Sequence, residues 1–240
     1  MTRLVIAAAV LALSTGLAAA QTVRMGTEGA YPPYNFINDA GEVDGFEREL
    51  GDELCLRAGL TCEWVTTDWD SIIPNLQSGN YDTIIAGMSI TEERAKVIDF
   101  TQNYIPPAAS AYAALSPDAD LKGGVIAAQV GTIQAGYVAE SGATLLEFAT
   151  PDETVAAVRN GEADAVFADR DYLAPIVAES GGDLSFAGAD IQLGGGVGMG
   201  LRKSDTELKA KFDAAIQSMK DDGTLNAMIL KWFGAEATTF

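Results

Sequence analysis

The sequence predicts an α/β fold made of two successive units, each a mostly parallel sheet with helices on both faces. Strand and helix patterns alternate through residues 22–95 in β-α-β-α-β order. The same alternation starts again near Gly124 and continues to Glu179. After this second unit comes Gly194-Gly195-Gly196, a run flexible enough to be a crossing strand or a hinge.

The first unit is predicted from two kinds of periodicity. Apolar residues recur at helical spacing in 46–58, at Phe46, Leu50, Leu54 and Ala58. Glu92 and Glu93 stand in the first turn of a helix that starts near Thr91, where a helix dipole favours acids. The remaining elements are strands at 22–26, 61–66 and 82–86, and a helix at 69–77 that ends before Gly79.

The second unit, between about Ala108 and Gly194, repeats the pattern. Its predicted strands are 125–128, 145–148 and 164–168, and its helices are 152–159, 172–179 and one from Gln134 onward. A strand at 197–202 and two helices, 205–219 and 224–233, then complete the chain.

Composition excludes several classes of function. The chain has 34 Asp and Glu residues against 15 Lys and Arg residues, and it has no histidine. An acidic surface disfavours nucleic acid and anionic membranes as partners. Without histidine, the usual metal ligand and the usual general base are missing. We therefore expect no metal site and no cofactor.

Residues 1–20 have the pattern of a secretory signal peptide. Arg3 supplies the positive start, residues 4–13 are apolar, and Ala18-Ala19-Ala20 offers small residues for cleavage. The apolar run is short for a membrane-spanning helix, which needs about 20 residues. We expect an exported protein that begins at Gln21, with a net charge that changes from −19 to −20 because Arg3 is lost and no acid is.

The two cysteines are Cys55 and Cys62. An even number of cysteines in an exported chain favours a disulfide, and two buried free thiols are the alternative. The spacing does not fit a redox CxxC motif.

Chemistry-bearing residues follow the predicted strands, and open α/β sheets bind ligands beyond the carboxyl ends of their strands. Glu28 and Tyr31 follow the first strand, just before the stiff Pro32-Pro33 pair. A rigid turn with an acid and an aromatic ring can hold a cation. The alternative is a capping acid beside a packed tyrosine.

Candidates for binding an anion follow the third strand. Ser89 or Thr91 can cap the next helix, and free backbone N–H groups at such a start favour anions. Arg94 lies within two turns and can hold a carboxylate through two parallel hydrogen bonds. The alternative for Arg94 is a solvated surface charge.

The second unit offers a matching set. Gly131-Thr132-Ile133 supplies backbone donors between a strand and a helix. Asp169 follows strand 164–168 and can accept from an ammonium group, and its alternative role is the N-cap of the next helix.

Together these groups form a site complementary to a zwitterion. Arg94 and the helix starts would take an α-carboxylate, and Asp169 would take an α-ammonium group. Trp69 and Tyr31 would flank an aliphatic stem, and Glu28 would meet a second cation at its far end.

The chain resembles the polar amino-acid-binding proteins of bacterial ABC importers, in the branch that binds lysine/arginine/ornithine, histidine and opines. The resemblance covers essentially the whole chain after the signal peptide. It rests on GTEGAYPPYNF at 26–36, GF at 45–46, DWDSIIP at 68–74, SITEER at 89–94, DFT at 99–101, GT at 131–132, GEADA at 161–165, VGMGLRK at 197–203 and DGT at 222–224.

The resemblance implies a type II periplasmic binding protein: two lobes, residues 21–107 with 195–240 and residues 108–194, joined by two hinge strands. It also implies a Cys55–Cys62 disulfide, a carboxylate bound by Arg94 and an ammonium group bound by Asp169. The predicted ligand-binding residues are Glu28, Tyr31, Trp69, Ala86, Gly87, Met88, Ser89, Arg94, Gln129, Thr132, Ile133, Gln134 and Asp169.

The sequence departs from the cationic branch at three positions. Ala86 and Gly87 stand where that branch has two serines, and Glu28 replaces an aspartate. The loss of the two serines widens the pocket at Ala86 and Gly87, and Glu28 reaches one methylene further than an aspartate. Both kinds of change resemble opine-binding relatives. We expect a monomeric receptor for lysine, arginine or ornithine, with histidine as a further candidate and octopine- or nopaline-like opines as the alternative. Its protein partner is expected to be the ABC permease at the inner membrane.

Two other classes of function compete. A few proteins with this fold are cyclohexadienyl dehydratases, but this chain has no histidine and no acid–base pair beyond the groups assigned to ligand. A sensing domain of a receptor would bring a membrane segment or a signalling domain, and neither pattern is found. We therefore predict a binding protein and not an enzyme.

Overall fold

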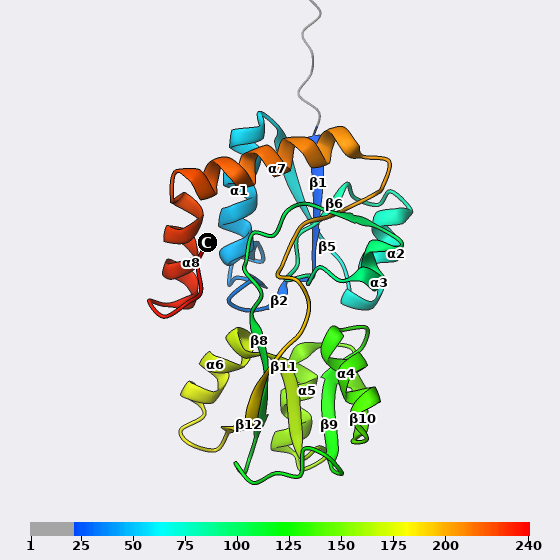
Figure 1. Cartoon of the computed structure of the whole chain (residues 1–240), viewed down its shortest axis with the longest axis vertical. Helices are drawn as coiled ribbons and strands as arrows, with labels where there is room; N and C mark the ends of the chain where they lie inside the picture. The colour runs from blue at the N-terminus through cyan, green and yellow to red at the C-terminus, as the bar shows by residue number, and fades with distance from the viewer. Residues whose placement is uncertain (1–21) are drawn as a thin grey trace, which may run out of the picture.

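The computed structural model describes residues 22–240, which form two α/β lobes stacked along the long axis of the molecule (Figure 1). The first lobe contains both β1 (Thr22–Thr27) and the last helix, α8 (Thr224–Phe233). The predicted signal peptide, residues 1–20, and the predicted start at Gln21 lie outside the described residues. Within residues 22–240, no helix combines the length and the apolarity that crossing a bilayer requires.

The first lobe is built on a five-stranded sheet in the order β5-β1-β6-β13-β7. Its other strands are β5 (Thr61–Thr66), β6 (Thr83–Ile84), β7 (Asp99–Phe100) and β13 (Gly200–Leu201). Its other helices are α1 (Phe46–Ala58), α2 (Ile72–Gln77), α3 (Glu92–Ala95) and α7 (Thr206–Asp221). β5, β1 and β6 are parallel, whereas β13 runs antiparallel to β6 and β7.

Two cores cover the faces of this sheet. Phe46, Leu50 and Phe212 join α1, α7 and α8 into one core against β1. Ile72 and Leu76 of α2 form the other core. A small antiparallel sheet, β2 (Ala30–Tyr31), β3 (Asn35–Ile37) and β4 (Val43–Asp44), lies between β1 and α1 in the chain.

The second lobe repeats the arrangement in the order β10-β9-β11-β8-β12. Its strands are β8 (Ala109–Ala114), β9 (Val125–Gln129), β10 (Thr144–Phe148), β11 (Ala165–Asp169) and β12 (Ser185–Gln192), and its helices are α4 (Ile133–Ser141), α5 (Pro151–Arg159) and α6 (Arg170–Glu179). β10, β9 and β11 are parallel, and β8 is antiparallel to both β11 and β12. Both sheets therefore have the predicted, mostly parallel centre.

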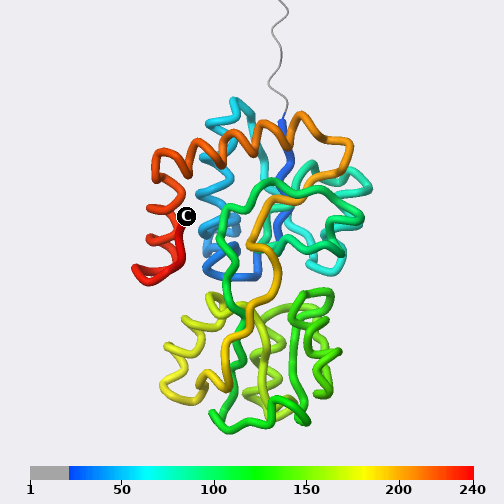
Figure 2. Tube along the Cα trace, viewed as in Figure 1, coloured from blue at the N-terminus to red at the C-terminus, as the bar shows by residue number. Residues whose placement is uncertain are grey.

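The chain crosses between the lobes twice, from β7 to β8 and from β12 back to β13 (Figure 2). The two crossings touch, because Val197 bridges Ile105. Gly196 has φ +92°, and a Cβ there would lie 2.6 Å from the Ile105 carbonyl oxygen, so this close approach requires glycine. The predicted lobe limits, 107/108 and 194/195, fall within these crossings, and we propose them as the limits.

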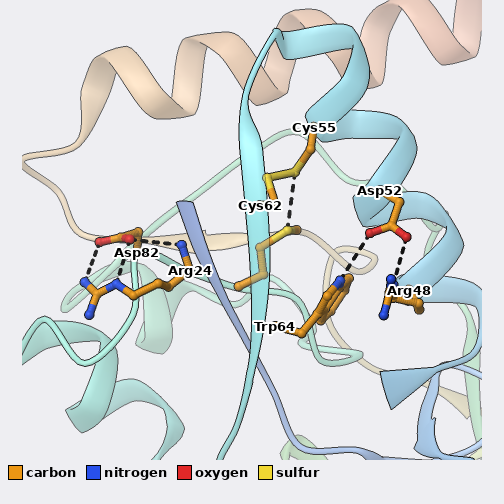
Figure 3. Close-up of a disulfide and its surroundings, with 8 residues drawn as sticks. Arg24, Arg48, Asp52, Cys55, Cys62, Trp64 and Asp82 are labelled. Atoms are coloured by element: carbon orange, nitrogen blue, oxygen red, sulfur yellow. Dashed lines mark hydrogen bonds and ion pairs between the residues drawn. A yellow bond between two sulfur atoms is a disulfide. The ribbon is translucent and has the colours of Figure 1, made fainter. Parts of the chain in front are cut away.

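Cys55 of α1 and Cys62 of β5 form the predicted disulfide, with Cα atoms 6.2 Å apart (Figure 3). The alternative of two free thiols was therefore wrong. A second contact joins the same two elements, since Trp64 Nε1 donates to Asp52 Oδ1 at 3.2 Å. The end of α1 is thus held firmly against the edge strand of the first sheet.

Some elements differ from their predictions for identifiable reasons. The predicted helix 69–77 is a 3₁₀ turn at Trp69–Ser71 followed by α2, because Pro74 has no N–H and fits only in the first turn of an α-helix. The predicted strands 82–86 and 197–202 shorten to β6 and β13, since the flanking residues form cavity and hinge loops. β8 was missed because ASAYAA contains no β-branched residue.

Candidate functional site

A small cavity lies between the lobes, at the carboxyl ends of strands from both sheets. Glu28 follows β1, Gln129 ends β9 and Asp169 ends β11. The cavity is lined by Glu28, Tyr31, Trp69, Ala86, Gly87, Ser89, Arg94, Gln129, Thr132, Ile133, Gln134 and Asp169. The fold thus brings together all the residues predicted from the sequence except Met88.

Met88 occupies a different position. Its side chain has no exposed surface and packs in the core with Ile72 and Leu76, on the face of the sheet that α2 covers. Trp69 belongs to the same apolar cluster. Met88 therefore supports the cavity wall from behind, because its apolar side chain gains more from this core than from a polar cavity.

Arg94 brings the positive charge. Its Nη1 donates to the Ser89 carbonyl oxygen at 2.9 Å, and its Nη2 donates across the cleft to the Gly131 carbonyl oxygen at 3.2 Å. The guanidinium carbon lies 5.4 Å from the centre of the Trp69 ring. Burial lowers the pKa of Arg94 to about 10, so the group stays charged at neutral pH. Arg94 is a cavity residue and not a solvated surface arginine.

Asp169 brings a negative charge from the second lobe. It occupies the N-cap position of α6, but its side chain makes no capping hydrogen bond. Its Oδ2 accepts from Tyr31 Oη at 2.9 Å, and its Oδ1 accepts from Gln134 Nε2 at 2.9 Å. Burial raises the pKa of Asp169 to about 6, against the opposing effect of the Tyr31 hydrogen bond. At neutral pH the carboxylate is ionised.

Glu28 brings a second carboxylate, from the first lobe. Its Oε1 accepts from Gln129 Nε2 across the cleft at 2.6 Å. Burial raises the pKa of Glu28 to about 7, and the negative charges of Asp68 and Asp152 raise it further, while the hydrogen bond from Gln129 lowers it. Glu28 is therefore an acid whose ionisation depends on what donates to it.

Aromatic rings from both lobes meet beside these charges. Tyr31 stacks on Tyr172, with ring centres 4.3 Å apart and an interplanar angle of 12°. Tyr172 belongs to α6 and was not predicted as a site residue. Because Tyr31 contacts Tyr172 with its ring and Asp169 with its hydroxyl, one side chain of the first lobe makes two contacts with the second.

Thr91 and Thr132, and not Ser89, cap the two helices that begin at the cavity. Thr91 Oγ1 accepts from Arg94 N at 3.1 Å, and Thr132 Oγ1 accepts from Ala135 N at 3.1 Å. The capping bond at Thr91 fixes the backbone of Arg94 directly. Since α3 has only four residues, the guanidinium of Arg94 is the main source of positive potential on that side.

The geometry fits binding of a zwitterion. One lobe presents the Arg94 guanidinium, and the other presents the Asp169 carboxylate. Neither forms an ion pair within residues 22–240. A buried charge without an ionic partner is costly, so a ligand that carries both opposite charges is favoured here. Glu28 adds a site for a second positive group.

Comparison with known sequences places this arrangement in a family. The profile of the bacterial extracellular solute-binding proteins, family 3, matches residues 23–235. The chain belongs to this family.

Individual family 3 proteins resemble the chain over nearly its whole length. One is a periplasmic His/Glu/Gln/Arg/opine family-binding protein from Silicibacter pomeroyi, whose crystal structure was solved in complex with lysine. Its sequence is 80% identical to this chain, and the two structures superpose with a TM-score of 0.90 over 91% of this chain and 100% of that chain. The lysine/arginine/ornithine-binding periplasmic protein of Escherichia coli strain K12 is 32% identical, over 92% of this chain and 91% of that protein. The octopine-binding periplasmic protein of Rhizobium meliloti is 31% identical, over 96% of this chain and 97% of that protein. Each is named as a binding protein, and the two-lobed architecture agrees with this family.

The structure of this family 3 protein also shows a buried acid that the sequence reasoning missed. Glu47 has no exposed surface, and it accepts from Tyr104 Oη, from Gly87 N at 2.6 Å and from Asn35 Nδ2 at 2.7 Å. Asn35 Oδ1 in turn accepts from Gly29 N at 2.7 Å. Glu47 thereby connects both cavity loops of the first lobe.

A signal for Glu47 was present in the sequence. Glu47, Leu50 and Leu54 are spaced i, i+3 and i+7, so the acid lies on the apolar stripe of α1. An acid on such a stripe is buried and needs donors. Burial raises the pKa of Glu47, while its three hydrogen bonds oppose the rise.

Replacing Glu47 by glutamine is expected to destabilise the protein and weaken its site. The amide nitrogen would face a donor, because all three partners of Glu47 donate. We expect the free energy of unfolding to fall by about 1–3 kcal/mol and the affinity for all amino acids to fall by a common factor. Urea unfolding and calorimetric titration measure the two effects.

Glu53 provides the control, since it lies on the same helix and pairs with Arg57 near the surface. Glu53→Gln should change the free energy of unfolding by less than about 1 kcal/mol. Equal losses in both variants would show that Glu47 is an ordinary surface acid in solution.

Proposed function

We propose that this protein is the periplasmic receptor of an ABC importer for a cationic amino acid, with lysine, arginine and ornithine as the main candidates and histidine as a further one. The observation that carries the proposal is the joint placement of Arg94, Asp169 and Glu28 around one cavity between two lobes. Arg94 takes the α-carboxylate, Asp169 the α-ammonium group and Glu28 the distal cation. Trp69 and Tyr31 lie against the aliphatic stem.

The proposal includes delivery of the ligand. Residues 1–20 are removed on export, and the monomeric protein carries its ligand to the permease at the inner membrane. Membership of an extracellular solute-binding family supports this role. The lysine complex of the similar Silicibacter pomeroyi protein supports the choice of ligand class.

Isothermal titration calorimetry of refolded, ligand-stripped protein tests the proposal. The panel is lysine, arginine, ornithine, histidine, glutamine, glutamate and octopine. We expect the tightest binding among the cationic members. Tightest binding of glutamate would refute the assignment of Glu28, and absence of binding across the panel would refute the amino-acid receptor.

An opine is the second candidate, because Ala86 and Gly87 both line the cavity and neither has a polar side chain. Gly87 has φ +62°, a conformation that favours glycine, so a larger side chain is disfavoured at this point of the wall. An opine is an amino acid with a second carboxyl arm, which needs room of this kind. Octopine binding tighter than that of arginine would favour this candidate.

The affinity for lysine is expected to depend on pH through Glu28. The pKa of Glu28 is raised to about 7, so the carboxylate becomes protonated as the pH falls through 7. A lysine ammonium group favours the ionised form. Lysine binding should therefore release a proton below pH 7, and the affinity should fall by up to about tenfold per pH unit there.

Glutamine is the reference ligand for this measurement, because its neutral side chain gains nothing from the ionisation of Glu28, in contrast to the lysine ammonium group. Protonation of Asp169, whose pKa is about 6, lowers the affinity for both ligands equally, because both carry the α-ammonium group. The ratio of the lysine affinity to the glutamine affinity between pH 8 and pH 6 thus isolates Glu28. A ratio that stays constant over this range would contradict the assignment.

A further inference from the structure

Gln129 is held in a fixed orientation at the tip of β9. Its side-chain amide donates one hydrogen bond to the Ala149 carbonyl oxygen at 3.0 Å, inside the second lobe. The other bond of the same nitrogen crosses the cleft to Glu28 Oε1 at 2.6 Å. Gln129 is 8% exposed, so the rest of the residue is packed. The amide is therefore aimed at Glu28 by its own lobe.

Glu28 has few other sources of stabilisation. Within residues 22–240 it forms no ion pair, and the acids near it, Asp68 and Asp152, repel its charge. A half-buried carboxylate in this setting needs a donor. The chain supplies one in Gln129, and a ligand with a distal cation can supply another at the remaining oxygen.

We infer that Gln129 sets how strongly the protein discriminates between cationic and neutral amino acids, by keeping Glu28 hydrogen-bonded when the lobes close on a ligand without a distal charge. The inference rests on the proposed function. It extends the ligand class to amino acids with a neutral, hydrogen-bonding end, such as an amide or a ureido group. Cationic ligands remain preferred, because only they compensate the charge of Glu28.

Gln129→Leu tests this role. Leucine has a similar volume and no donor, so Glu28 would lose its partner in complexes with neutral ligands, whereas a lysine ammonium group would still reach it. We expect the ratio of the lysine affinity to the glutamine affinity to rise by about tenfold. Titration calorimetry at pH 8 with lysine, glutamine and citrulline measures it. Loss of the bond to Ala149 affects all ligands alike and cancels in the ratio.

Gln134→Leu is the matched control. Gln134 is also a buried glutamine of the second lobe, and its amide donates to Asp169, which faces the part common to all amino acids. This variant should lower the affinity for all ligands by the same factor and leave the ratio of the lysine affinity to the glutamine affinity unchanged. Gln129→Met, of similar length and without a donor, repeats the test if the leucine variant folds poorly.

A double-mutant cycle separates this role from general packing. In a Glu28→Gln background, Gln129→Leu should no longer change the ratio, because the charge that needs the donor is gone. A ratio that stays within about twofold in Gln129→Leu, or that changes equally in both backgrounds, would overturn the inference while leaving the proposed function intact. If the unmodified protein binds no amino acid, the proposed function fails and the inference fails with it.

Discussion

Arg94→Ala should reduce the affinity for every α-amino acid by at least about a hundredfold, which corresponds to about 2.7 kcal/mol. Among residues 22–240, the Arg94 guanidinium is the only cationic group that lines the cavity. Its removal leaves a buried α-carboxylate without a charged partner, and the penalty is the same for lysine, glutamine and octopine. Calorimetric titration of the same panel measures the loss.

Arg48 supplies the matched control for this variant. It is an arginine of α1 that pairs with Asp52 at the surface, outside the cavity (Figure 3). Arg48→Ala removes the same side chain and should leave affinities within about twofold. Survival of binding in Arg94→Ala would mean that the carboxylate is held elsewhere, with the backbone around Thr132 as the next candidate.

Glu28→Gln should lower the affinity for cationic amino acids much more than the affinity for neutral ones. The amide still accepts from Gln129 but no longer compensates a distal cation. We expect lysine, arginine and ornithine to lose at least about tenfold in affinity, and glutamine to change by less than about threefold. This variant should also remove the pH dependence of lysine binding near pH 7, because the titrating group is gone.

The net charge of the protein changes by one unit in Glu28→Gln, and Glu63→Gln makes the same change on an exposed part of β5. Glu63→Gln should leave the affinity for lysine unchanged, since surface charges are screened by salt. Equal losses of affinity for lysine and glutamine in Glu28→Gln would show that Glu28 stabilises the contact between the lobes and does not bind the side chain of the ligand.

Local patterns predicted most of the fold because they are set by neighbours in the chain. The bounds of α1, β5 and α8 agree with the predicted ranges 46–58, 61–66 and 224–233. Prediction was weakest near the hinge. β8 and β12 pair with each other and β8 also pairs with β11, so the partners that make these residues strands lie far away in the sequence.

Sequence patterns alone located the residues at the carboxyl ends of strands, and these residues form most of the cavity lining. Arg94, Asp169 and Glu28 could be selected because a parallel sheet brings its strand ends to one edge. The acid at Glu47 was also visible as a break in an apolar stripe, although its meaning was not. Met88 was misplaced because a residue beside a cavity loop can face either side of it.

The pairing of these groups depends on how the two lobes are placed in three dimensions. Tyr31 with Asp169, Gln129 with Glu28, and Arg94 with the Gly131 carbonyl are contacts between lobes, at distances of 2.9, 2.6 and 3.2 Å. No local pattern encodes them, because each joins segments of different lobes that lie far apart in the sequence. Their charges and hydrogen bonds depend on burial, which is a property of the closed cleft and not of either segment alone.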